Sequence, residues 1–254
     1  MPTPLRDITT ALDAELGIAH TPDYPGALNG LQLENPGHVT KVACAVDACL
    51  PVVEAAVEQQ CDLLIVHHGL FWGGPHKITG GLYRKWQRAI QSDLAIYSAH
   101  LPLDIHPTLG NNALLAESLG LPTGTPFFPW KGIELGLHIQ LETHLTRDTL
   151  AGRLAETLGS PAHLCPGGPE TISRIGILTG GAGSEIHALA QTGIDTIITG
   201  EGPHWSYTAA EELGINLFYG GHYATETFGV RALGQWLEQH HKLPHTFINH
   251  PTGL

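Results

Sequence analysis

Positive charge is scarce in this sequence. Of its 254 residues, 12 are Lys or Arg and 24 are Asp or Glu, which gives a formal net charge of −12. An acidic surface repels phosphate backbones, and the sequence contains no basic cluster with interleaved aromatic residues. Direct binding of nucleic acid is therefore not expected.

Long apolar runs and paired cysteines are also lacking. No stretch approaches the roughly 18 apolar residues of a membrane span, and the start, MPTPLRDITTALDAELG, predicts a helix and not a signal peptide. The four cysteines (Cys44, Cys49, Cys61 and Cys165) form no CxxC pair. A structural zinc site and a disulfide framework are thus unsupported, and we expect the reducing cytoplasm as the location.

Motifs for covalent catalysis and for phosphate binding are weak or missing. The sequence has no GxSxG and no cysteine in a nucleophile context. Gly180-Gly-Ala-Gly183-Ser184 matches neither GxGxxG nor the P-loop pattern. It is typical of two structures, an anion-binding turn or a tight β-to-α turn, and the second is the more common explanation.

What the sequence does contain is an alternation of strand and helix patterns, which predicts an α/β fold. Predicted strands cover 40–46, 62–66 and 94–98, and predicted helices cover 50–60, 83–91 and 111–119, the last with Asn111-Asn112 as its N-cap. The Pro- and Gly-rich stretch 121–132 is the best boundary. We therefore expect a first α/β domain over 1–125 and a second over 126–254, with the C-terminal segment free to pack back on the first.

The second half of the chain resembles the first. Asp195-Thr-Ile-Ile-Thr199 follows Asp62-Leu-Leu-Ile-Val66 by 133 positions, and NLFYGGHYATE matches LAIYSAHLPLD at an offset of 122. This pattern predicts an internal duplication, although generic βαβ similarity is the alternative. Because α/β sheets bind ligands at the carboxyl ends of their strands, the cleft between two such units is the expected site.

Histidines and carboxylates gather after these predicted strands. His67-His68 ends an apolar run, His100 precedes Asp104 by four residues, and His222 precedes Glu226 by four. A histidine four residues before a carboxylate is common on protein surfaces. Imidazole and carboxylate groups together, however, are the ligands of first-row divalent metals. Pro102 indicates that His100 to Asp104 forms a turn more than a helix. His76 and His106 are expected to be ordinary loop histidines.

With these residues in view, the chain resembles the GTP cyclohydrolase I type 2 homologue family, the Nif-three-like dinuclear-metal-centre proteins. The resemblance covers nearly the whole chain in its short form, without an inserted middle domain. It rests on a set of motifs that occur in order: Asn29-Gly-Leu-Gln32, VHHGLFW (66–72), HLPLD (100–104), LGNNA (109–113), GGAGS (180–184), TGE (199–201) and GHYATE (221–226).

The resemblance implies two α/β domains, a toroidal homohexamer and a dinuclear metal site with His67, His68, Asp104, His222 and Glu226 as ligands. The repeat also points to His100 and Glu201, which we interpret as proton-transfer residues or as supports of the ligands.

The ligand types admit zinc, iron, manganese, nickel or cobalt. We expect metal-assisted hydrolysis of a small, nucleotide-like substrate, in the cyclohydrolase version by attack on C8 of a purine ring, with Glu226 bridging two ions. The alternative is a non-catalytic metal-binding ring protein that acts as a scaffold, chaperone or metal store.

Overall fold

The computed structural model describes residues 2–254 and confirms the α/β class. The chain divides into two compact units. Unit 1 comprises residues 2–103 and Gly229–His250, and unit 2 comprises Asp104–Phe228 and Pro251–Leu254. Compared with the expected domain ranges, residues 104–125 lie in unit 2 and Gly229–His250 lies in unit 1.

Unit 1 is built around a five-stranded sheet in the order β13-β4-β5-β6-β2. The strands from β13 to β6 are parallel, and β2 is antiparallel to β6. The bounds of the sheet are β2 Gly30–Leu33, β4 Val42–Asp47, β5 Leu63–His68, β6 Ala95–Ser98 and β13 His245–Phe247. The remaining elements are β1 Thr3–Pro4, β3 His38–Val39, α1 Leu5–Glu15, α2 Leu50–Glu58, α3 Gly80–Gln91, α4 Leu101–Asp104 and α10 Thr227–His241.

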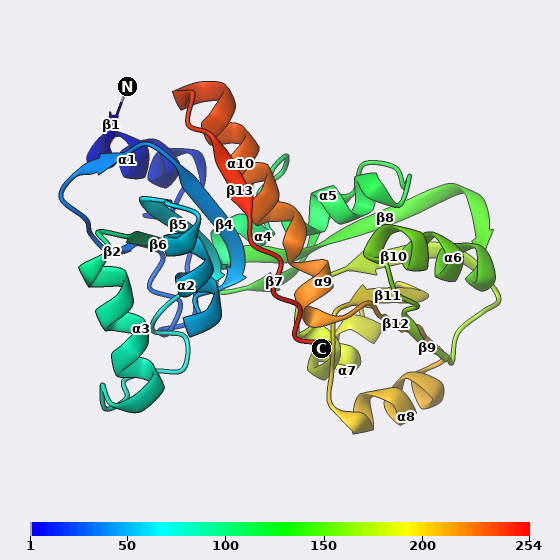
Figure 1. Ribbon diagram of the computed structural model, residues 1–254. Coiled ribbons are helices and arrows are strands. Elements are labelled where there is room, and N and C mark those ends of the chain that lie inside the picture. Colours follow the sequence, from blue (N-terminus) through cyan, green and yellow to red (C-terminus); the bar gives the residue numbers. More distant parts are fainter. Residues whose placement is uncertain (1) are drawn as a thin grey trace. The chain divides into compact units, whose positions relative to one another are not determined.

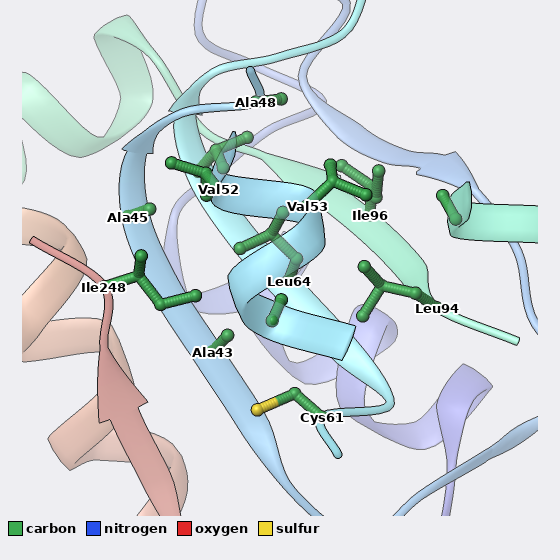
Figure 2. Close-up of a cluster of buried hydrophobic side chains, with 13 residues drawn as sticks. Ala43, Ala45, Ala48, Val52, Val53, Cys61, Leu64, Leu94, Ile96 and Ile248 are labelled. Atoms are coloured by element: carbon green, nitrogen blue, oxygen red, sulfur yellow. The ribbon is translucent and has the colours of Figure 1, made fainter. Parts of the chain in front are cut away.

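Burial in the core of unit 1 explains why its strands are continuous apolar runs in the sequence. Helices α2 and α3 lie alongside the sheet (Figure 1). In Figure 2, Val52 and Val53 of α2 lie among Leu64 of β5 and Ile96 of β6, all of them buried. Ile248, just after β13, belongs to the same cluster, and its N–H donates to the carbonyl of Cys44. The C-terminal strand is thus part of this core.

Unit 2 contains a six-stranded sheet in the order β7-β8-β10-β11-β12-β9, with β10, β11 and β12 parallel. Its strands are β7 Thr125–Trp130, β8 Ile133–Thr146, β9 His163–Pro166, β10 Thr171–Ile177, β11 Thr196–Thr199 and β12 Asn216–Tyr219. Its helices are α5 Asn111–Ser118, α6 Arg147–Leu158, the 3-10 turn η1 Ala182–Glu185, α7 Ile186–Ala190, α8 His204–Leu213 and α9 His222–Thr225.

Both faces of the second sheet are covered. Ile198 packs with a cluster that contains residues of α5 and α6, whereas its neighbour Ile197 packs with residues of α7 and α8. Phe218 and Leu217 divide in the same way. Successive side chains of a strand point to opposite faces, so strands buried on both faces must be apolar throughout.

The parallel ladders of the two units can be compared residue by residue. Val42 pairs with Leu63 in unit 1, and Ile175 pairs with Thr196 in unit 2, so both members differ by 133. On the third strand Ile65 pairs with Tyr97, while Ile198 pairs with Phe218, a difference of 121. The offset between the hydrogen-bonded pairs on the third strand is therefore one residue smaller than the 122 of the sequence match. The internal duplication remains a prediction.

Three local expectations need correction. The stretch 121–132 contains edge strand β7 and its hairpin turn, because Pro is tolerated at a sheet edge. Gly110, and not Asn111-Asn112, is the N-cap of α5. Leu101–Asp104 forms the short helix α4, because Pro102 stands in the first turn, where its missing N–H costs nothing. Within residues 2–254, no helix has the length and apolar character that crossing a membrane requires.

Candidate metal centre

Three buried histidines converge at the carboxyl end of the first sheet. His67 and His68 are the last residues of β5, and His100 follows β6. One ring nitrogen from each lies within 4.8 Å of the others. Pairing of β5 with β6 ends at Val66, two residues before the strand ends. The adjacent rings of His67 and His68 can therefore approach each other, with centroids 4.8 Å apart.

Each ring is oriented by an oxygen atom. The Nδ1 atoms of His67, His68 and His100 lie 2.9, 2.9 and 2.8 Å from the Ala99 carbonyl, the Asp47 carboxylate and the Asp23 carboxylate. These oxygens only accept, so Nδ1 carries the proton and the lone pair of the neutral ring is on Nε2. A carboxylate or carbonyl behind a histidine is the usual support of a metal ligand. The donor set therefore fits a metal ion.

The Asn29-Gly-Leu-Gln32 motif positions the histidine cluster. Asn29 donates to Asp23 through Nδ2 and accepts from the backbone N–H of His100, at 2.8 Å in both cases. Gln32 accepts from Leu70 N–H at 2.6 Å and donates to the carbonyl of Ala27. One residue thus supports the start of the His100 turn, and the other supports the loop after His68.

Burial of the Asp23 carboxylate opposes ionisation, but hydrogen bonds from His100 and Asn29 outweigh it and lower its pKa. Asp23 is consequently an anion that stabilises a proton on His100 Nδ1.

Two exposed aromatic side chains border the cluster. The Trp72 ring lies 4.3 Å from the His100 ring and 5.2 Å from the His68 ring, centroid to centroid. Tyr24 meets Trp72 edge to face at 6.2 Å. Trp72 is 40% exposed and Tyr24 46% exposed, so both side chains are partly in contact with solvent.

Unit 2 holds a second group of polar residues, at the carboxyl ends of β11 and β12. His222 Nδ1 lies 2.8 Å from Glu201, and its Nε2 lies 3.1 Å from Glu226 in the i,i+4 arrangement predicted from the spacing. Burial alone would lower the pKa of His222, but the carboxylates of Glu226 and Glu201 raise it to about 9. Without metal this ring holds a proton, and a metal ion would take the place of that proton.

The glycine-rich segment is a turn that makes room for Glu226. Gly180 has φ of +70°, and a Cβ built there would lie 2.2 Å from Glu226 Oε1. The N–H groups of Gly180, Ala182 and Gly183 donate to Thr225, Thr199 and the Glu201 carbonyl. Since these donors are already used inside unit 2, the structure supports the tight β-to-α turn and not the anion-binding turn.

Asp104 is buried in unit 2, where its Oδ1 accepts from Asn111 Nδ2 at 2.8 Å and from the Thr179 hydroxyl at 3.3 Å. The structure thus groups His67, His68 and His100 in unit 1, and His222, Glu226 and Glu201 in unit 2. Asp104 lies in unit 2 with its own hydrogen-bond partners.

Comparison with known proteins shows the family of the chain. Residues 4–252 match the family described as Duf34/NIF3 (NGG1p interacting factor 3). The chain belongs to the Duf34/NIF3 family. NIF3 relatives called "GTP cyclohydrolase 1 type 2 homolog" include one from Deinococcus radiodurans, 42% identical over 91% of this chain and 88% of its own, and one from Halobacterium salinarum, 38% identical over 98% and 99%. The resemblance noted in the sequence is confirmed.

Solved structures with the NIF3 fold cover the full chain. TTHA1606 from Thermus thermophilus is 38% identical, with a TM-score of 0.89 over 99% of this chain and 100% of its own. The protein ybgI, of unknown function, is 34% identical, with a TM-score of 0.92 over 99% and 100%. HcgD from Methanocaldococcus jannaschii, at 23% identity and a TM-score of 0.87 over 98% and 99%, shares the fold.

Sequence patterns missed the oxygen atoms that orient the rings. Asp47 ends β4 one strand away from His68, so the rule that ligands gather at carboxyl ends of parallel strands would have found it. Asp23 lies in an irregular loop 77 positions before His100. No spacing connects these two residues, and only the folded chain brings them together.

Proposed function

We propose that this protein is a metal-dependent hydrolase that acts on a small substrate. Its proposed ligands to two divalent ions are His67, His68, Asp104, His222 and Glu226. The observation that carries the proposal is the pair of buried imidazoles His67 and His68, each with Nδ1 against an oxygen acceptor, so that Nε2 carries the lone pair that a metal ligand needs. A ring nitrogen of His100 lies within 4.8 Å of theirs. Purely structural histidines need no such shared orientation.

The residues around the ligands have separate roles in this scheme. Bound divalent ions supply Lewis acidity and make a water molecule acidic enough to act as a nucleophile near neutral pH. Glu226 offers two oxygens and is the best candidate for a shared ligand. Asp47 and Glu201 hold the rings of His68 and His222. His100, with Asp23 behind it, and Glu201 are the candidates for proton transfer.

The proposed substrate class is a nucleotide-like molecule, as the name of the GTP cyclohydrolase homologues suggests. Zinc, iron, manganese, nickel and cobalt all suit the ligand set.

The test is metal content per subunit, measured by plasma mass spectrometry on untagged wild type and on the variants His68→Ala and Glu226→Ala. His76→Ala, at an exposed loop histidine, is the matched control. We expect about two equivalents in wild type and in the control, and a loss in both ligand variants. Release of product from GTP by the metal-loaded wild type, absent in Glu226→Ala, would support the hydrolase. Wild-type protein that folds without retaining metal would refute it.

The second candidate is a non-catalytic metal-binding ring protein. The observation that favours it is the family description, which names an interacting factor and no reaction. Two bound ions without turnover of any nucleoside triphosphate would support this candidate over the hydrolase.

We also propose a homohexamer in the cytoplasm. The hexamer is what the family resemblance implies, and the cytoplasmic location is supported by four cysteines that are free thiols in the structure. Light scattering after size exclusion should give a mass six times the 27.2 kDa of one chain. A monomer or dimer at micromolar concentration would contradict the assembly.

A further inference from the structure

Unit 2 contains a cavity of about 420 Å³, and Asp104 is the one proposed metal ligand that lines it. Leu114, Leu121 and Leu137 contribute apolar surface to it, from α5, the following loop and β8. A volume of this size is within the range of small-molecule sites, which are mostly apolar with a few polar groups that fix the ligand.

Glu134 of β8 is the polar residue that distinguishes this cavity. Glu134 lines the cavity, and its Oε2 atom is buried with no hydrogen-bond partner among residues 2–254. A buried acceptor without a donor is costly, and native proteins seldom leave one. Two other carboxylate residues line the cavity: Asp104, which already accepts from Asn111 and Thr179, and Glu117, which is exposed on α5. Glu134 therefore needs a donor from outside the chain.

The cavity walls are held in place before any ligand arrives. Asn112 of α5 donates to the Leu135 carbonyl at 2.9 Å and accepts from Thr179 N–H at 2.9 Å. These bonds join the helix to the strand that carries Glu134. His106, which also lines the cavity, accepts from Leu109 N–H through Nδ1, so its neutral ring carries the proton on Nε2.

We propose that this cavity binds the ring of a small amino-substituted nitrogen heterocycle, with Glu134 accepting from its N–H groups. A ring N–H next to an amino group presents two parallel donors, which match the two oxygens of one carboxylate. The leucine walls suit the faces of a flat ring better than they suit a hydrated ammonium group. Asp104 lines the cavity and is also a proposed metal ligand. Binding of the ring does not depend on the proposed function, whereas a reaction of the bound ring at the metal ions rests on it.

The experiment is isothermal titration of guanosine, whose base has this donor pair, and of inosine, which lacks the amino group. Full-length wild type is compared with Glu134→Gln, with Ala113→Leu, which narrows the cavity, and with Glu142→Gln. Glu142 lies exposed on the same strand and does not line the cavity, so it is the matched control. Each protein is titrated as purified and after chelator treatment, which separates ring recognition from metal binding.

We expect wild type and Glu142→Gln to bind guanosine at least about tenfold more tightly than inosine. We expect Glu134→Gln to lose that preference and Ala113→Leu to bind neither nucleoside. Equal binding of guanosine by wild type and Glu134→Gln would overturn the proposal, as would the absence of binding by wild type. A preference that persists after chelation, in a protein that fails to hydrolyse GTP, would leave the cavity assigned and the hydrolase refuted.

Discussion

Each imidazole of the histidine cluster makes a hydrogen bond through Nδ1, and this bond determines which nitrogen presents its lone pair. For His68 the partner is Asp47, and for His100 it is Asp23. Both aspartates are outside the proposed ligand set. The effect of Asp47 on a metal is indirect, because it fixes the tautomer and the orientation of the His68 ring and raises its basicity. Asp23 fixes His100, the candidate for proton transfer, in the same way.

Replacement of Asp47 by Asn should weaken metal binding without removing a ligand. The amide either donates or accepts more weakly, so His68 loses its support, and supporting residues of this kind typically change metal affinity about ten- to a hundredfold. Competition with a chromogenic chelator measures the change. Asp93→Asn is the control, because Asp93 is exposed at φ of +51°, where Asn is well tolerated. Equal affinities for the two variants would contradict the role of Asp47.

His222 should make the stability of metal-free protein depend on pH. Its pKa is about 9 in the folded chain against 6.5 ordinarily, because two carboxylates outweigh burial. The stabilisation is therefore fully present below about pH 6.5 and is lost as the pH rises through about 9. With allowance for the partly exposed Glu201, the loss should be on the order of 1–2 kcal/mol.

Urea unfolding of chelator-treated protein at pH 6.5 and 9.5 measures this loss as the difference between wild type and His222→Gln. The variant lacks the titrating ring, so its stability should change less across this interval. Parallel stability curves for the two proteins would show that the ring does not hold the extra proton.

At the scale of elements, short turns after strands carry the candidate residues. His222 begins the four-residue helix α9 directly after Gly221, whose φ is +93°. Gly180, between β10 and η1, lies against Glu226 and also accepts from Gly200 N–H at 2.8 Å. The position of the Glu226 carboxylate thus depends on the backbone of a neighbouring turn.

Gly180→Ala should impair metal binding more than its backbone strain alone explains. Its Cβ would lie 2.2 Å from Glu226 Oε1, at φ of +70°. Gly214 has the same φ and open space around it, so Gly214→Ala is the matched control. Both variants should lose about 1 kcal/mol or more of stability. Only Gly180→Ala should also lose metal, as measured by mass spectrometry, and equal metal content in both would argue against the contact.

At the scale of the whole molecule, metal should stabilise the folded chain, because unfolding scatters ligands from distant parts of the sequence. Free metal at a hundred times its dissociation constant contributes about 2.7 kcal/mol. For a chain of this size, that corresponds to a rise in Tm of roughly 5–10 °C. Calorimetry of chelator-treated protein with and without Mn²⁺ measures the rise. A doubly substituted His68→Ala, Glu226→Ala protein should show none, and an equal rise there would indicate nonspecific binding.

Some strands and helices of the molecule could be predicted from sequence patterns, and others could not. The strand at 62–66 was predictable, because a parallel strand buried on both faces needs an unbroken apolar run. The helix predicted at 50–60 is also observed. The Pro-rich β7 was not predictable, since only its place at the sheet edge makes Pro126 acceptable. The offset of 121 between the hydrogen-bonded pairs of the third strands could not be read from the sequence either. A shift of one residue leaves two apolar runs similar, but it changes which backbone groups form hydrogen bonds.

By itself, the sequence determined the α/β class, the family and the set of histidines and carboxylates at strand ends. These properties follow from local periodicity and from residue types at short spacing. Only the tertiary structure decided that Asp23 and Asp47 orient the rings, that the glycine turn makes room for Glu226, and that Glu134 faces a cavity. Such contacts join residues far apart in the chain, and their energy depends on distances that no spacing encodes.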